Sequence, residues 1–146
     1  LRSSKAAMFA FDAVMAFWNA PLDDPDHALH ALQAAQEMLK AMEQINLDLQ
    51  ALLPKDIEIP PIKMGIGVNT GTCVVGNMGS DQRFDYSVLG DTVNVASRLE
   101  GQCKEYQKDI LIGENTVKVA ESLKFQKVAD ITVRGRSSSE QVYTFG

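Results

Sequence analysis

The sequence predicts an α+β domain in which one sheet is covered by helices, and three observations support this prediction. Short apolar segments with the alternation typical of strands are interspersed with segments of helical periodicity. Turn signals rich in glycine, proline and asparagine separate these segments. The 146 residues are 45% hydrophobic, which is enough for one core. We therefore expect a single domain over residues 1–146, with 1–8 as an atypical or displaced N-terminal segment.

The first half of the chain predicts a strand or hairpin followed by a long helix. Residues 9–18 are apolar and aromatic with one carboxylate, as in a buried strand or hairpin. Asp24 is a good N-cap and Pro25 suits a first helical turn, so a helix is expected to begin there. Its apolar stripe continues to about residue 50 and comprises Leu29, Leu32, Leu39, Met42 and Leu49.

The middle of the chain predicts a hairpin. Residues 62–68 alternate as a strand, and Asn69-Thr70-Gly71 is a turn signal. Residues 72–76 would then return as the hairpin partner, and 77–81 would form a loop. Further along, we expect strands at 86–89, 109–112, 125–133 and 141–145, and helices at 91 to about 106 and 114–122.

The stretch from Phe84 to Arg98 is the most informative part of the sequence. It predicts a strand, a tight turn at Gly90 and a helix capped by Asp91. Asn94 and Arg98 are four residues apart and share one face of that helix. Backbone N–H groups, an amide and a guanidinium together suit a phosphate. The alternative is a helix whose Arg98 pairs with a surface acid such as Glu105.

The same stretch resembles a motif of the class III nucleotidyl cyclases, the adenylate and guanylate cyclase family. The matching residues are Tyr86, Gly90, Asp91, Val93, Asn94, Ala96 and Arg98. Segments 12–18, 67–71, 75–79 and 133–136 also resemble segments of that family, so the resemblance covers the chain from about Asp12 onward. It implies a ferredoxin-like core with a mainly antiparallel sheet, and head-to-tail homodimers with active sites in the interface.

The resemblance also implies an activity and residue roles. The ribose 3′-hydroxyl of ATP attacks the α-phosphate, giving cyclic AMP and pyrophosphate. Asn94 orients the ribose, and Arg98 stabilises charge on the phosphates. Arg134 and Arg136 hold the β- and γ-phosphates. Two Mg²⁺ or Mn²⁺ ions are implied, because carboxylate oxygens suit such cations.

Other positions concern the metal and the purine. Asp12 resembles the second metal-binding carboxylate of the family. Ser87 falls at a base-reading position, where its hydroxyl resembles the Thr of some adenylate cyclases and favours ATP over GTP. Phe11 stands where the family usually has Gly, and Met8 stands where adenylate cyclases have a base-reading Lys.

The family's first strand, which carries the other metal-binding Asp, is absent from these residues. We therefore expect this chain alone to be inactive. Two alternatives remain within the family: a guanylate cyclase, and a catalytically dead cyclase-homology module that dimerises or senses a nucleotide. An unrelated ferredoxin-like interaction domain is a third.

Composition restricts the partners and the location. The net charge of −5 argues against nucleic acid. No apolar run is long enough to span a bilayer, so we expect a cytoplasmic domain without direct membrane contact, whose full-length protein could be anchored through upstream domains. Cys73 and Cys103 favour reduced thiols, although a disulfide stays open. His27 and His30 predict a solvated helix face rather than a metal pair.

Overall fold

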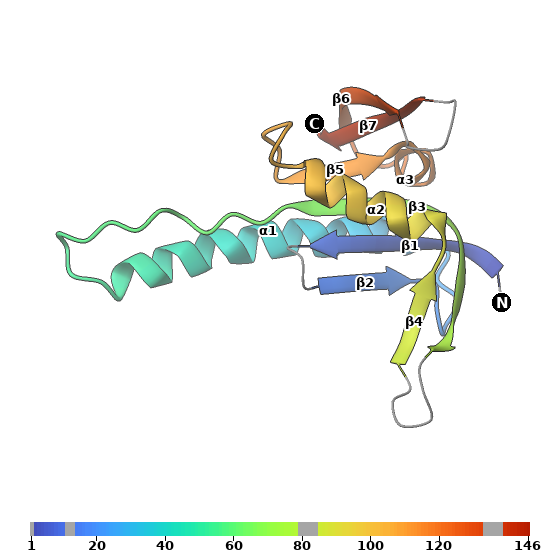
Figure 1. The fold of residues 1–146 in the computed structure, drawn as a ribbon, viewed down its shortest axis with the longest axis horizontal. Helices are drawn as coiled ribbons and strands as arrows, with labels where there is room; N and C mark the ends of the chain where they lie inside the picture. The colour runs from blue at the N-terminus through green and yellow to red at the C-terminus, as the bar shows by residue number, and fades with distance from the viewer. Residues whose placement is uncertain (1, 11–13, 79–84, 133–138) are drawn as a thin grey trace.

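The computed structural model describes residues 2–10, 14–78, 85–132 and 139–146 (Figure 1). These residues form a mixed arrangement of strands and helices in chain order. The elements are β1 (Arg2–Ala10), β2 (Val14–Trp18), α1 (His27–Ala51), β3 (Ile66–Met78), β4 (Asp85–Leu89), α2 (Asp91–Gln102), β5 (Ile110–Gly113), α3 (Glu114–Val119), β6 (Phe125–Thr132) and β7 (Ser139–Phe145).

The described strands form one sheet in the order β2-β1-β3-β5-β7-β6, with β4 paired to the C-terminal half of β3. The pairing of β3 with β5 is parallel, and all the other pairings are antiparallel. The predicted α+β fold, with one mainly antiparallel sheet covered by helices, is therefore confirmed.

Helices α1 and α2 cover opposite faces of this sheet (Figure 1). Successive side chains of a strand point to opposite faces. In β3, Ile66 and Val68 pack against α1, whereas Cys73 and Val75 pack against α2. The part of α1 in this core consists of Ala28, Ala31, Leu32 and Ala35. Strand β3 is thus the central element between the two helical layers.

The prediction that Asn69-Thr70-Gly71 turns the chain is wrong. These residues lie in the middle of β3, where they pair directly with residues of β1. Thr70 is buried, and its Oγ1 is hydrogen-bonded at 2.9 Å to Oγ1 of Thr116 in α3. Tertiary partners therefore override the local turn preference. Residues 72–76 continue the same strand, and so do 77–78, which were expected in a loop.

Residues 1–8 have no clear amphipathic pattern in the sequence, yet residues 2–10 form β1 between β2 and β3. The expected strand or hairpin at 9–18 is a hairpin of β1 and β2. Lys5, although charged, is buried, and its Nζ donates a hydrogen bond to Asn19 O.

Two predicted helix caps are displaced. The N-cap of α1 is Asp26 rather than Asp24. Asp24 instead organises the preceding turn, because its Oδ1 accepts a hydrogen bond from Asp26 N and its backbone oxygen accepts one from His27 N. The N-cap of α2 is Gly90, and Asp91 is the first helical residue. The acidic side chain of Asp91 thus lies in the first turn, where the helix dipole favours it.

The C-terminal half of α1 extends beyond the sheet (Figure 1). Its side chains hold the returning segment: Asn46 forms hydrogen bonds with both backbone groups of Ile62, and Gln50 bridges Ile57 and Ile59. This return is irregular up to β3, which begins at Ile66, so the strand predicted from residue 62 starts four residues later. Ile62 therefore lies outside the strand and is 42% exposed. Among the described residues, no helix is both long and apolar enough to cross a membrane.

The two histidines near the start of α1 have different environments. His30 is exposed, and its Nδ1 lies 2.8 Å from Asp24 Oδ2. His27 is only 6% exposed, so the prediction of a solvated face is wrong for it. Burial lowers the pKa of His27, with the charge of Lys5 adding to this and that of Asp24 opposing it. The hydrogen bond with Asp24 raises the pKa of His30.

We expect these two shifts to have opposite effects on stability near pH 6.5. The raised pKa of His30 contributes stability below pH 6.5, which is lost as pH rises through its folded value. The lowered pKa of His27 contributes stability above pH 6.5, which is lost as pH falls. His30→Gln should therefore cost more stability at about pH 5.5 than at about pH 7.5, as measured by urea unfolding.

The salt dependence provides the control for this prediction. Because His30 and Asp24 form an exposed pair, the pH-dependent difference should shrink at about 1 M salt. A larger loss at the higher pH would contradict the assigned direction of the His30 shift.

Candidate active site

The candidate site is built around the junction between β4 and α2. Gly90 joins them with φ of +147°, a conformation that glycine adopts readily and other residues do not. Its backbone oxygen accepts hydrogen bonds from the N–H groups of Val93 and Asn94, which start the helix. The predicted strand, glycine turn and helix are therefore all present. Helix α2 ends at Gln102, before the predicted end near Tyr106.

The first turn of α2 is fixed to β3 by hydrogen bonds. Thr92 Oγ1 donates to Thr72 O at 3.2 Å, and Asn69 Nδ2 donates to Thr92 O at 3.2 Å. Asn69 is 3% exposed, so its bond with the helix is made away from water. These contacts connect the middle of β3 to the start of the helix that carries the motif.

Close backbone contacts with β3 fix the position of the rest of α2. A Cβ added at Gly67 would lie 2.0 Å from Ala96 O and 2.4 Å from Glu100 N. A Cβ at Gly71 would lie 2.4 Å from Thr92 Oγ1. Both glycines belong to β3 and face α2, so the missing side chains allow the helix to approach the strand. The position of the whole motif helix therefore depends on these two residues.

Asn94 and Arg98 lie one turn apart on α2, as predicted. Asn94 is exposed, while Arg98 is half-buried. Arg98 Nη1 is buried and has no hydrogen-bond partner among the residues that the structure describes. The alternative in which Arg98 pairs with Glu105 is not observed among the ion pairs of the described residues. A desolvated guanidinium nitrogen without an acceptor is costly unless an anion or another acceptor completes it.

A family model described as the adenylate and guanylate cyclase catalytic domain matches residues 11–145. The chain belongs to this family. Among the curated relatives, adenylate cyclase 1 of Rhizobium meliloti is 37% identical over 136 residues, which cover 92% of this chain and 20% of the relative. The adenylate cyclase of Anabaena cylindrica is 36% identical over 136 residues, covering 90% and 26%. This cyclase domain thus spans about a quarter or less of these two relatives.

Solved structures confirm the fold of the cyclase domain. The adenylyl cyclase CyaB from P. aeruginosa superposes with a TM-score of 0.84 at 22% identity, covering all of this chain and 95% of that one. The guanylyl cyclase Cya2 gives a TM-score of 0.81 at 20% identity, with coverages of 97% and 91%. The similar scores for an adenylyl and a guanylyl cyclase leave the purine to be inferred from the residues of this chain.

Ser87 lies on β4, seven residues before Asn94. It pairs with Gly76 of β3 and is half-buried. The next residue, Val88, packs against α2, so Ser87 points to the other face of the sheet. No hydrogen bond between described residues joins Ser87 to Asn94 or Arg98. The cyclase domain therefore brings Asn94 and Arg98 together on one helix, with Ser87 on the strand that leads to it.

The remaining predicted site residues, Asp12, Arg134 and Arg136, lie outside the described residues. Within the part of the cyclase domain that the structure describes, no three His, Cys, Asp or Glu side chains are grouped as metal ligands. The described residues therefore do not by themselves fit a site for Mg²⁺ or Mn²⁺.

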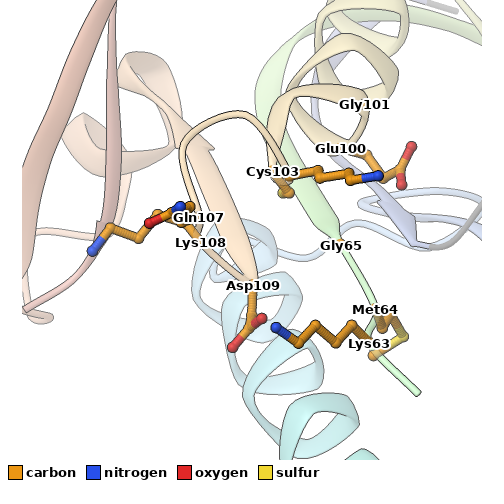
Figure 2. A pocket seen from close by; sticks show the side chains of 10 residues that line it. Lys63, Met64, Gly65, Glu100, Gly101, Cys103, Gln107, Lys108 and Asp109 are labelled. Carbon is orange, nitrogen blue, oxygen red and sulfur yellow. The ribbon is translucent and has the colours of Figure 1, made fainter. Parts of the chain in front are cut away.

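A cavity of about 810 Å³ lies elsewhere, at the C-terminal end of α2 and the starts of β3 and β5 (Figure 2). Asn94 and Arg98 do not line it. Figure 2 shows the side chains of Lys63 and Asp109 pointing toward each other across it. Its buried Cys103 has a pKa raised to about 11, mainly by desolvation, and is a poor nucleophile. We therefore do not assign the reaction to this cavity.

Sequence reasoning did not single out Gln102 on the motif helix. It is four residues after Arg98 and eight after Asn94, so the three share one side of α2. Its Oε1 is buried and finds no hydrogen-bond partner in the described ranges. The i, i+4, i+8 spacing is visible in the sequence and could have indicated this residue.

Proposed function

We propose that this domain converts ATP to cyclic AMP and pyrophosphate. The observation that carries the proposal is the placement of Asn94 and Arg98 on one side of α2, with Arg98 Nη1 buried and without an acceptor among the described residues. A triphosphate supplies oxygen acceptors that a guanidinium binds in a forked geometry. The family membership of the chain supports the same reaction.

The roles of the residues follow from their chemistry. Asn94 is exposed and offers an amide to the ribose hydroxyls. Arg98 stabilises the negative charge that grows on the α-phosphate as the 3′-hydroxyl attacks. Arg134 and Arg136 hold the departing pyrophosphate through charge-assisted hydrogen bonds. Fixed placement of α2 on β3 keeps Asn94 and Arg98 in a constant relation to the nucleotide.

We further propose that Ser87 contacts the purine and favours adenine. Its hydroxyl both donates and accepts hydrogen bonds, as an adenine edge requires. Asp12 would contribute one carboxylate ligand for Mg²⁺ or Mn²⁺. Such ions, when bound, neutralise phosphate charge and lower the pKa of the attacking hydroxyl.

The acting unit is proposed to be a head-to-tail homodimer. Strand β4 pairs only with β3 among the described strands, so its outer edge is open. Val74 and Leu89 are paired neighbours on these strands and are 41% and 58% exposed. Such clustered apolar side chains support an interface with a second copy. We place the domain in the cytoplasm, where ATP is available.

A catalytically dead module that dimerises or senses a nucleotide is the second candidate function. The shortage of metal ligands favours this candidate, because Asp12 is the single carboxylate that the motifs assign to the metal. No cluster of ligand side chains among the described residues adds to it. The two candidates share the nucleotide site and differ in turnover.

The test is cyclic-nucleotide production with Mn²⁺ from ATP and from GTP. It compares the 146-residue chain with a version extended N-terminally by the family's first strand. We expect little turnover by the 146 residues alone, because one carboxylate of the pair is missing, and ATP turnover by the extended version. Direct measurement of cyclic AMP and cyclic GMP separates the two activities.

Three other outcomes of this measurement would each change the proposed function. Robust turnover by the 146 residues would contradict the role assigned to the carboxylate pair. A preference for GTP would contradict the assignment of Ser87. Absence of turnover in both versions, with nucleotide binding retained, would favour the dead module.

A further inference from the structure

A donor and an acceptor without partners lie one helical turn apart on α2. Arg98 Nη1 and Gln102 Oε1 are both buried, and neither forms a hydrogen bond within the described part of the chain. Leaving such groups unpaired is costly, and more so where one of them is charged. Native structures rarely keep a buried donor and a buried acceptor unpaired when they are within reach of each other.

The geometry of the helix brings these two side chains toward each other. Residues at i and i+4 are neighbours on a helix surface, with Cβ atoms about 5–6 Å apart. Side chains on a helix lean toward its N-terminus, so the amide of Gln102 leans over the turn that carries Arg98. Both side chains are long enough for rotation of their terminal groups to pair Oε1 with Nη1.

The surroundings of this side of α2 favour the pair. Val95 lies three residues before Arg98 and seven before Gln102, so it is on the same side of the helix. It packs in a cluster with Ile131 of β6 and Val142 of β7. An apolar neighbourhood of this kind strengthens a hydrogen bond made within it.

We propose that Gln102 is a positioning residue for Arg98: rotation of the two terminal groups lets Arg98 Nη1 donate a hydrogen bond to the amide oxygen of Gln102. This bond fixes one edge of the guanidinium and directs the remaining N–H groups toward the phosphates. The amide is neutral, so it orients the guanidinium without cancelling its positive charge. The inference rests on the proposed cyclase function for its consequence, but the pairing itself does not.

Two substitutions at Gln102 test separately the loss of its acceptor oxygen and the addition of a negative charge. Gln102→Leu keeps similar bulk and removes the acceptor, whereas Gln102→Glu keeps an oxygen and adds a negative charge. Gln33→Leu is the matched control, because Gln33 is an exposed glutamine in the N-terminal third of α1. Thermal unfolding of all three checks that the fold is retained.

The pairing is measured by NMR of the Arg98 side chain in the 146-residue protein, with assignment by Arg98→Lys. A hydrogen bond at Nη1 slows rotation of the guanidinium and separates its Nη resonances. We expect separate resonances in the unchanged protein, in Gln33→Leu and in Gln102→Glu, and averaged ones in Gln102→Leu. Identical Arg98 spectra in the unchanged protein and Gln102→Leu would overturn the proposal.

The effect of the Gln102–Arg98 pairing on catalysis is measured as turnover of the N-terminally extended version. Gln102→Leu should lower kcat about tenfold with little change in the KM for ATP, since a hydrogen bond to a charged group is lost where charge develops. Gln102→Glu should instead raise KM, because its charge repels the triphosphate. Equal kcat for Gln102→Leu and Gln33→Leu would refute the positioning role. An inactive extended version with an intact NMR signature would count against the cyclase function alone.

Discussion

Arg98→Ala is expected to lower the turnover of the extended domain about 10²–10³-fold, the range found when one preorganised donor to a developing negative charge is removed. The fold should lose little, because Arg98 takes part in no ion pair among the described residues. Alanine also suits the interior of a helix. The free energy of unfolding should therefore change by about 1 kcal/mol or less. Steady-state cyclic AMP production and urea unfolding measure the two effects separately.

Two further variants make the Arg98 experiment specific. Arg98→Lys keeps the charge but loses the forked donors, so its turnover should fall between those of the unchanged protein and Arg98→Ala. Lys104→Ala removes an exposed positive charge two residues after the end of α2 and should leave turnover unchanged. Unchanged turnover in Arg98→Ala would remove Arg98 from the active site.

Gly67→Ala is expected to destabilise the protein by about 3 kcal/mol, at the upper end of the usual cost of overpacking. The new Cβ would lie 2.0 Å from Ala96 O and 2.4 Å from Glu100 N. Both atoms belong to the backbone of α2, so no side-chain rotation relieves the clash. The helix must move away from β3, and turnover should fall as well because Asn94 and Arg98 move with it. Urea unfolding gives the stability change.

Gly101→Ala is the matched control for this substitution. A Cβ at Gly101 meets no atom within 4 Å, and the residue lies in α2 itself. Alanine is a better helix former than glycine, so this variant should be more stable by up to about 1 kcal/mol. If Gly67→Ala were as stable as Gly101→Ala, the close seating of α2 on β3 would be refuted.

The motif helix could be predicted from the sequence because its determinants are local. Gly90, the alternation of β4 and the i, i+4 placement of Asn94 and Arg98 require no knowledge of distant residues. The exact N-cap was displaced by one residue, since Gly90 with its positive φ precedes the first helical residue. The roles of Asp12, Arg134 and Arg136 stay predictions.

The parts that sequence reasoning missed depend on long-range contacts. Asn69-Thr70-Gly71 has the composition of a turn, but the pairing of β1 and the partners Thr92 and Thr116 keep it extended. The burial of His27 depends on how the start of α1 lies against the sheet. The requirement for glycine at position 67 appears only when the helix that it faces is in place.

The two cysteines allow the opening of each end of α2 to be followed separately. Cys73 packs beneath the first half of the helix, and Cys103 follows its last residue. Both thiols are buried, and burial raises the pKa of both, that of Cys103 to about 11. At pH 7 only about one Cys103 thiol in ten thousand is then a thiolate. Alkylation of either residue must wait for a local opening, so the two labelling rates report how often each end of the helix separates from the sheet.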